Sequence, residues 1–196
     1  MRAYRVASGR VIHPFGDHVR ECFVGVDPIA TWQAAAVSAC GLELADVDSL
    51  DRATDRPCVL FFDDVFFSEM ALRQFVAAAS STAGDVALAM RDSVALGACE
   101  PLSDARQLDD GARAFDVFHL RAPQVARERE ALRLSTSPCF VDTREWTRRL
   151  RLPPSIVETN ETRQRTSSVV AAPLTARVVA HVRHWIHLLR LSQLAI

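Results

Sequence analysis

The clearest pattern of apolar and polar positions lies near the middle of the chain. Residues 57–62 form one continuous apolar run, which is typical of a strand that is covered on both faces. Ser68 can cap a following helix, and Phe67 and Leu72 occupy the positions of a hydrophobic staple around that cap. Residues 85–90 are a second strand candidate, apolar from Val86 onward. The order of strand, helix and strand predicts a βαβ unit.

Similar signals predict further elements. Pro28 suits the first position of a helix over residues 28–40, in which Ile29 and Trp32 recur at helical spacing and Gly41 is a natural stop. The remaining strand candidates are short apolar runs at residues 11–12, 22–26, 115–120, 138–142 and 150–152.

The end of the chain predicts a helix of roughly twenty residues that starts near Pro173 or Thr175 and is apolar around more than half its circumference. The polar residues 158–168 predict an exposed loop or linker. The fold class is therefore α/β, with a mostly parallel open sheet flanked by helices and a long C-terminal helix. We expect an α/β domain over 1–157, a loop or linker over 158–172, and a helix over 173–196 for packing, oligomerisation or connection to a following domain.

Composition narrows the classes of protein. With 196 residues, 49% of them hydrophobic and 24% charged, the chain can bury one substantial core and is not disordered. A net charge of −1 gives no basic stripe for nucleic acid. All 23 basic residues are arginine, which excludes a Schiff-base or Walker-type lysine. An anion would have to be held by arginine, backbone N–H groups or a metal.

The five cysteines are dispersed and form no C-x-x-C pair, which is typical of reduced thiols in a cytoplasmic protein. The N-terminal residues do not resemble a signal peptide, and no stretch without charges is long enough to span a membrane. We therefore expect a cytoplasmic location.

Asp63 and Asp64 are the strongest candidate site, because they directly follow the apolar run at 57–62. Ligands of open α/β sheets bind at the carboxyl ends of the strands. Carboxylates there can hold Mg²⁺ together with a substrate phosphate. The alternative is that one aspartate caps the next turn and the other faces solvent. A phosphatase of the haloacid dehalogenase type is excluded, because Val65 stands where its motif requires a second aspartate.

Arg148, Arg163 and Arg165 are candidates for binding an anionic substrate, because they lie in an arginine-rich region and the chain has no lysine. A solvated basic surface is the alternative interpretation.

The histidines at 181, 184 and 187 are spaced by three residues. On a helix, His181 and His184 would be neighbours that suit a metal, or an interface that titrates near neutral pH. A polar edge on a packed helix is the simpler alternative. We take His181, His184, Trp185 and Leu189 as candidate interface residues of a homo-oligomer.

Residues 57–90 resemble the middle of the sugar-phosphate nucleotidyltransferases, in which a strand ends in an aspartate that binds the catalytic Mg²⁺. The resemblance implies this role for Asp63 or Asp64. Residues 180–189 are similar to the helix that joins such domains to a left-handed β-helix in bifunctional nucleotidyl/acyltransferases. The family's glycine-rich nucleotide loop is missing from residues 1–25, and its lysine has no counterpart, so the resemblance implies a degenerate member.

Three functions follow as hypotheses. The first is a degenerate sugar-nucleotidyltransferase-like domain that binds a sugar phosphate or nucleotide sugar, with or without catalysis, and uses Mg²⁺. The alternative is a non-catalytic assembly domain that oligomerises through its C-terminal helix. A membrane-surface role for that helix, with Arg177, Arg183 and Arg190 facing anionic lipid, is the third and least supported.

Overall fold

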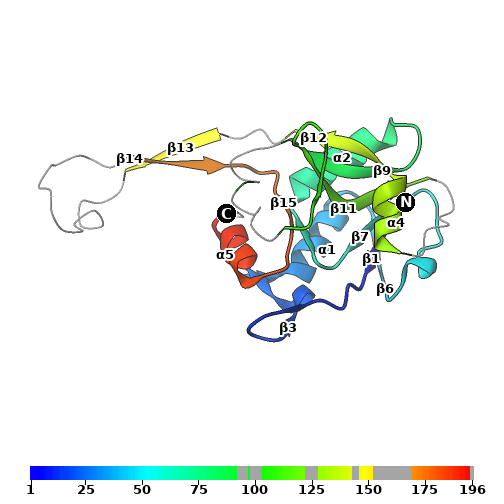
Figure 1. Cartoon of the computed structure of the whole chain (residues 1–196), viewed down its shortest axis with the longest axis horizontal. Helices are drawn as coiled ribbons and strands as arrows, with labels where there is room; N and C mark the ends of the chain where they lie inside the picture. The colour runs from blue at the N-terminus through cyan, green and yellow to red at the C-terminus, as the bar shows by residue number, and fades with distance from the viewer. Residues whose placement is uncertain (92–96, 98–102, 122–127, 143–145, 152–168, 195–196) are drawn as a thin grey trace, which may run out of the picture.

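The computed structural model describes residues 1–91, 97, 103–121, 128–142, 146–151 and 169–194 (Figure 1). Its centre is a seven-stranded sheet with the order β12-β9-β11-β7-β1-β6, to which β10 adds by pairing with β11. All strands of this order are parallel except β11, so the prediction of a mostly parallel sheet is confirmed. The bounds are β1 Arg2–Val6, β6 Glu43–Val47, β7 Cys58–Phe62, β9 Val86–Met90, β10 Arg106–Gln107, β11 Arg113–Leu120 and β12 Ser137–Val141.

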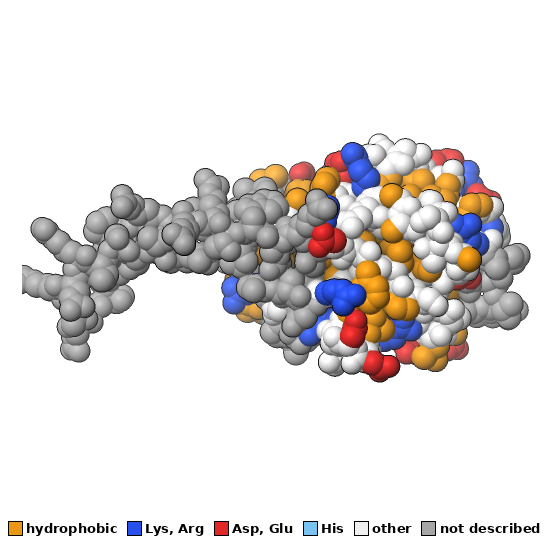
Figure 2. Space-filling model, turned by 90° about the horizontal axis from the view of Figure 1, so that it is seen from above, with side chains coloured by type: hydrophobic (Ala, Val, Ile, Leu, Met, Phe, Trp, Pro, Cys, Tyr) orange, Lys and Arg blue, Asp and Glu red, His pale blue; other side chains and the backbone are white. Residues whose placement is uncertain are grey.

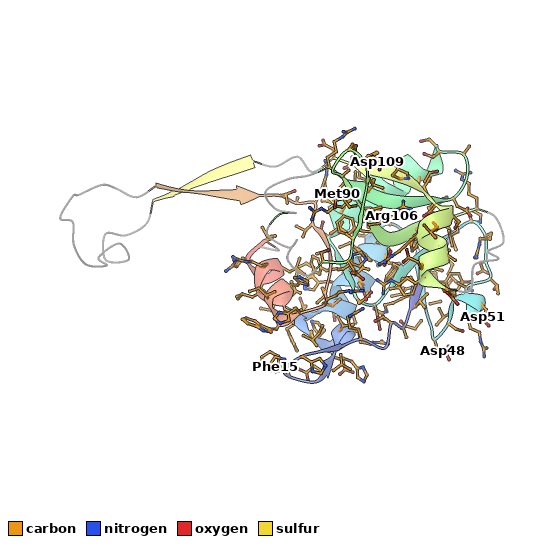
Figure 3. All side chains as sticks on the ribbon, in the orientation of Figure 1. Phe15, Asp48, Asp51, Met90, Arg106 and Asp109 are labelled. Atoms are coloured by element: carbon orange, nitrogen blue, oxygen red, sulfur yellow. The ribbon has the colours of Figure 1, made fainter. Side chains whose placement is uncertain are left out.

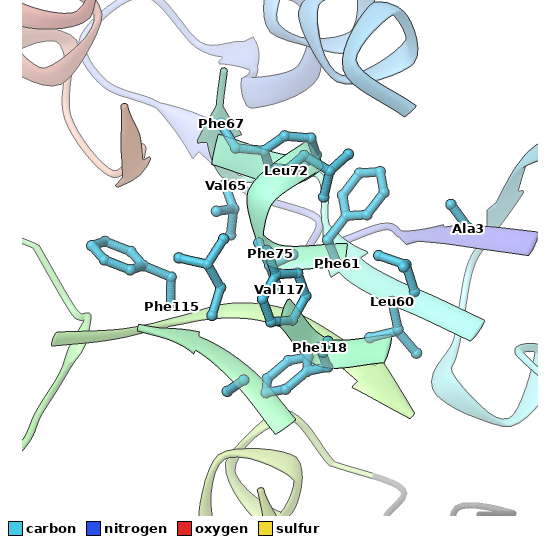
Figure 4. Close-up of a cluster of buried hydrophobic side chains, with 14 of the residues drawn as sticks. Ala3, Leu60, Phe61, Val65, Phe67, Leu72, Phe75, Phe115, Val117 and Phe118 are labelled. Carbon is cyan, nitrogen blue, oxygen red and sulfur yellow. The ribbon is translucent and has the colours of Figure 1, made fainter. Parts of the chain in front are cut away.

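Helices cover both faces of the sheet. Helices α1 (Ile29–Ala39) and α2 (Glu69–Ser80) lie on one face and contact each other, whereas α4 (Arg129–Ser135) lies on the opposite face (Figures 1 and 4). The predicted starts of α1 and α2 are confirmed. Ser68 accepts a hydrogen bond from the Ala71 N–H at 3.4 Å, as a cap should. Two short 3₁₀ helices, η1 (Val19–Glu21) and η2 (Leu50–Arg52), complete this part.

Three strands of the central sheet, β1, β6 and β10, had no counterpart in the sequence analysis. Arg5 breaks the apolar pattern of β1, yet it is buried, because its guanidinium forms two hydrogen bonds with the Asp46 carboxylate of β6 at 2.6 and 2.9 Å. A charge can be buried in this way only when its partner is supplied by the fold. The sequence of β1 can therefore be interpreted as a buried strand only when its pairing with β6 is known.

The C-terminal part corrects the largest prediction. Instead of one long helix over 173–196, β14 (Val169–Leu174) pairs with β13 (Trp146–Arg151), β15 (Val179–His181) pairs antiparallel with β8 (Val65–Phe67), and α5 (Trp185–Leu194) has ten residues. Val178, just before β15, and Val179, its first residue, favour extended structure, since β-branched residues lose side-chain freedom in a helix. The expected loop covered residues 158–172. Of these, residues 158–168 lie outside the described residues, and residues 169–172 belong to strand β14.

The two-stranded ribbon of β13 and β14 extends away from the rest of the molecule (Figure 1). We call the molecule without this ribbon the body. Four further short strands form two hairpins near the N-terminus. They are β2 (Val11–Ile12) with β3 (Asp17–His18), and β4 (Phe23–Val24) with β5 (Asp27–Pro28).

The body has two apolar clusters. The larger lies around the sheet, where Phe61, Phe67, Phe75 and Phe118 are among its fully buried side chains (Figure 4). The smaller joins the ends of the chain, because it combines side chains of the N-terminal hairpins and α1 with side chains of β8, β15 and α5. Its buried members are Ile12, Val19, Cys22, Val24, Ile29, Phe66, Val178, Ala180, Val182 and Leu191.

The described helices include none that is both long and apolar enough to cross a membrane. On the face of the body seen in Figure 2, basic, acidic and apolar side chains are interspersed.

Candidate functional site

The site begins where β1 and β7 end. The chain leaves β1 through α1 toward β6 at one edge of the sheet, and leaves β7 through α2 toward β9 on the other side. The neighbouring strands β1 and β7 therefore form a topological switch point, and ligands of open α/β sheets bind outside the carboxyl ends of strands at such a point. The Asp63 N–H donates to the Val6 carbonyl at 3.0 Å, which fixes Asp63 at this place.

A pocket of about 220 Å³ opens at these strand ends. Of the two arginines that line it, Arg5 is already hydrogen-bonded to Asp46, and this bonding lowers the pKa of the Asp46 carboxyl. Asp48, at the exposed margin of the body (Figure 3), and Asp63 add two further carboxylates. The lining residues are Arg5, Ala7, Arg20, Asp46, Val47, Asp48 and Asp63.

Asp63 is held firmly at the pocket wall. It is almost fully buried, and its Oδ1 accepts a hydrogen bond from the Ser8 N–H at 2.9 Å. The backbone around it is fixed by Gln33 of α1, whose Nε2 donates to the carbonyls of Asp63 at 3.2 Å and Val65 at 2.8 Å. Asp63 is thus a preorganised carboxylate at the switch point.

Asp64 points into different surroundings. It is fully buried, and its carboxylate accepts two hydrogen bonds from Arg129, at 2.8 and 2.9 Å, and one from Arg10 Nε at 2.9 Å. Burial by itself raises the pKa of Asp64, but the hydrogen bonds and charge of Arg129 outweigh it and hold this pKa below the ordinary value. The carboxylate is therefore ionised and engaged on both oxygens.

A second buried carboxylate, Asp116 of β11, is bonded to the same arginine. Asp116 accepts from Arg129 Nε at 2.5 Å, from Arg133 at 2.6 and 2.7 Å, and lies 3.0 Å from His181 Nε2. Burial raises its pKa, and the hydrogen bonds from His181 and Arg133 with the charge of Arg129 lower it far more. The Arg129 guanidinium also lies over the Phe62 ring, 4.3 Å from its centre.

Asp104 completes this charged network at its outer side. It forms ion pairs with Arg183 and, at 3.4 Å, with Arg133. His181 Nδ1 lies 3.7 Å from Asp104 Oδ1. We call the set of Arg10, Asp64, Asp104, Asp116, Arg129, Arg133, His181 and Arg183 the charged network.

The two neighbouring aspartates do not fit a shared Mg²⁺ site. Asp63 faces the pocket, whereas both oxygens of Asp64 hold arginines. Within the described part of the chain, no group of three or more His, Cys, Asp or Glu side chains is placed to hold a metal ion. The metal role of Asp63 or Asp64 stays a prediction.

The predicted interface residues lie in different surroundings. The ring of His181 is fully buried in the charged network and stacks on Phe115. The His184 Nδ1 accepts a hydrogen bond from the Ile186 N–H at 3.3 Å. Trp185 and Leu189 remain 40% and 45% exposed. Their interface role stays a prediction.

Of the three predicted substrate arginines, one lies within the described residues. Arg163 and Arg165 lie outside the described residues, and Arg148 lies on β13 opposite Ala172, in the ribbon that extends from the body (Figure 1).

The sequence analysis missed the arginines that bind Asp64 and Asp116. One signal was present, since Asp116 stands in an apolar strand run, and a buried carboxylate in a chain without lysine needs arginine or histidine partners. The partners come from elements such as α4 and β15, which are separated along the chain from the two aspartates. The sequence alone therefore does not show which residues pair.

The sequence matches no protein-family profile and no curated protein. Among solved structures, a Bacillus anthracis protein described as a glucose-1-phosphate thymidylyltransferase, in complex with a sucrose, aligns with a TM-score of 0.50 and 9% identity, over 74% of this chain and 88% of that one. A hypothetical transferase from Thermus thermophilus has a TM-score of 0.44 and 16% identity, with 62% and 66% covered. The inositol-1-phosphate CTP transferase from T. maritima has 0.43 and 10%, with 72% and 85% covered.

The first of these alignments shows that the chain has a nucleotidyltransferase-like fold, as the resemblance over residues 57–90 implied. That the chain is degenerate, or is joined to a left-handed β-helix, stays a prediction.

Proposed function

We propose that this chain binds a sugar phosphate or nucleotide sugar at the pocket between the carboxyl ends of β1, β6 and β7. The observation that carries the proposal is the position of Asp63. It is a buried, backbone-anchored carboxylate at the switch point of a nucleotidyltransferase-like sheet, and it lines the pocket. Catalysis is no part of the proposal.

The chemistry of the pocket suits a polyhydroxylated ligand. Asp48 and Asp63 offer carboxylate oxygens that accept hydrogen bonds from sugar hydroxyls, and Arg20 offers a guanidinium at 3.9 Å from the Asp46 carboxylate. These groups lie close together around a small volume, as is typical of sites in which a few polar groups orient a ligand.

Calorimetric titration with a panel of nucleotide sugars and sugar phosphates, with and without Mg²⁺, tests the proposal. We expect binding by at least one member of the panel and a loss of at least tenfold in Asp63→Asn. Asp109→Asn is the matched control, because it removes an exposed carboxylate on the far side of the body (Figure 3). No binding by any member, or equal binding by Asp63→Asn and the wild type, would refute it. A dependence on Mg²⁺ that Asp63→Asn abolishes would assign the cation to Asp63.

A second candidate function, homo-oligomerisation, is favoured by the exposed apolar side chains at α5. The Gly25 N–H donates to Ser192 Oγ at 2.9 Å, which places the tip of the β4–β5 hairpin against α5. Phe23 and Val26 of this hairpin are exposed, as are Trp185 and Leu189. Light scattering at micromolar concentration should then show a dimer or larger species that Leu189→Asp dissociates, and a monomeric wild type would exclude it.

A further inference from the structure

The outer edge of the charged network has two cations whose hydrogen-bonding capacity is only partly used. Arg10 donates to Asp64 through Nε, and Arg183 pairs with Asp104 through Nη2. Within the described part of the chain, no protein acceptor is recorded for the other guanidinium nitrogens of these two residues. A guanidinium has five N–H donors, so each residue retains most of its fork for another acceptor.

Both cations share their carboxylate with a more buried arginine. Asp64 is bonded at both oxygens by Arg129, and Asp104 also pairs with Arg133. The network is electrically balanced when the exposed Glu130, which pairs with Arg133, is counted. The attraction for an anion therefore comes from the position of two cations at the outer edge.

The two cations are close enough to repel each other. Burial lowers the pKa of Arg183, and the charge of Arg10 lowers it further. The side chains are 27% exposed for Arg10 and 37% exposed for Arg183, so an anion from solvent can reach them. An anion between them would remove the repulsion and accept from both forks, which is the bidentate geometry that arginine offers to phosphate.

The backbone that leads to Arg10 leaves room for such a ligand. Residues 7–9 are Ala, Ser and Gly, and they run directly from the end of β1. Gly9 has φ of +67° and no atom within 4 Å of the place where a Cβ would stand. The loop therefore offers open space at Gly9, next to Arg10 in the chain.

We propose that Arg10 and Arg183 bind the phosphate group of a ligand whose sugar lies in the pocket at Asp63. This inference rests on the proposed function. Asp63 and Asp64 are consecutive, so their Cα atoms are about 3.8 Å apart. Asp63 lines the pocket and Asp64 holds Arg10, so consecutive residues of the chain connect the pocket to the first of the two arginines. Arg183 follows β15, so the C-terminal segment contributes directly to the site.

Calorimetry with inorganic diphosphate, at low salt and without Mg²⁺, tests the anion site separately from the sugar. Arg183→Gln should weaken diphosphate binding at least tenfold, whereas Arg190→Gln should change it less than twofold. Arg190 is the matched control, because it lies on the exposed side of α5 and the substitution removes the same charge. Arg183→Lys keeps the charge but loses the planar fork, and should bind with intermediate affinity.

Three results would overturn the proposal: no diphosphate binding by the wild type, binding within twofold of it in Arg183→Gln, or an equal loss in Arg190→Gln. Circular dichroism checks that Arg183→Gln is folded. If it is not, Arg183→Lys carries the test, with a loss of at least threefold supporting the site and unchanged binding contradicting it.

A parallel titration with a nucleotide sugar separates this inference from the proposed function. Binding that is lost in Asp63→Asn and unchanged in Arg183→Gln would overturn the phosphate site and leave the proposed function standing. Diphosphate binding that depends on Arg183, in a protein that binds no nucleotide sugar, would support the anion site and refute the proposed function.

Discussion

Replacing Asp116 with asparagine tests how much the charged network stabilises the fold. Asparagine keeps the size of the side chain and removes its charge. Asp116 accepts four charge-assisted contacts, from Arg129, Arg133 and His181. At about 1.5–3 kcal/mol for each hydrogen bond to a charged group, their simple sum would be an overestimate, because Arg129 keeps its bonds to Asp64 and Arg133 keeps its exposed partner Glu130.

The loss of one partner from a buried ion pair costs about 3–5 kcal/mol, and this is the change that we expect in Asp116→Asn. For a chain of this length, it corresponds to a fall of about 6–20 °C in the midpoint of thermal unfolding. Urea unfolding followed by circular dichroism measures the free energy. Asp109→Asn, an exposed carboxylate, should change it by less than about 0.5 kcal/mol. A loss below 1 kcal/mol in Asp116→Asn, with an unchanged urea dependence, would refute the reasoning.

Three further predictions concern acid, a helix cap and a thiol. The pKa of Asp116 is depressed in the folded state, so its contribution to stability is full above about pH 4 and is lost as the pH falls below that value. Urea titrations at pH 7 and pH 3 should therefore show a smaller decrease in the free energy of unfolding in Asp116→Asn than in the wild type. Ser68→Ala should cost about 1–2 kcal/mol in the same assay, since Ser68 Oγ accepts from the N–H groups of both Ala71 and Val178; an unchanged midpoint would contradict this. Burial raises the pKa of Cys58 to about 11, so native protein at pH 8 should resist alkylation there until urea unfolds it, as peptide mass spectrometry can check.

The parts of the fold that could be predicted from the sequence are those in which neighbouring residues carry the signal. The apolar run of β7 and the capped, amphipathic α2 are both of this kind. Strand β1 is different, because an arginine such as Arg5 predicts an exposed position unless its pairing with Asp46 is known. The error at the C-terminus has a similar origin. His181 fits the polar edge of a helix equally well, whereas in the structure it lies at the end of a strand and contacts Asp116, 65 residues away.

The candidate site follows the same division. Asp63 and Asp64 could be located from their position after an apolar run, but their separate roles could not. Asp64 is fixed by Arg129, and Asp63 by the Ser8 N–H at the end of β1. Two adjacent residues of the same type therefore serve different purposes, and the difference depends entirely on elements that are distant in the sequence.

The smaller apolar cluster has a consequence for synthesis of the chain on the ribosome. Ile12, Val24 and Ile29 emerge early, yet Leu191, which packs in the same cluster, is added about 160 residues after Ile29. At the usual elongation rates this interval is on the order of 10–30 s. During that time the nascent chain presents apolar side chains without their final partners, and Asp64 lacks the Val182 N–H that its carbonyl accepts in the finished structure. The N-terminal hairpins are thus exposed to chaperones and to aggregation until α5 has been synthesised.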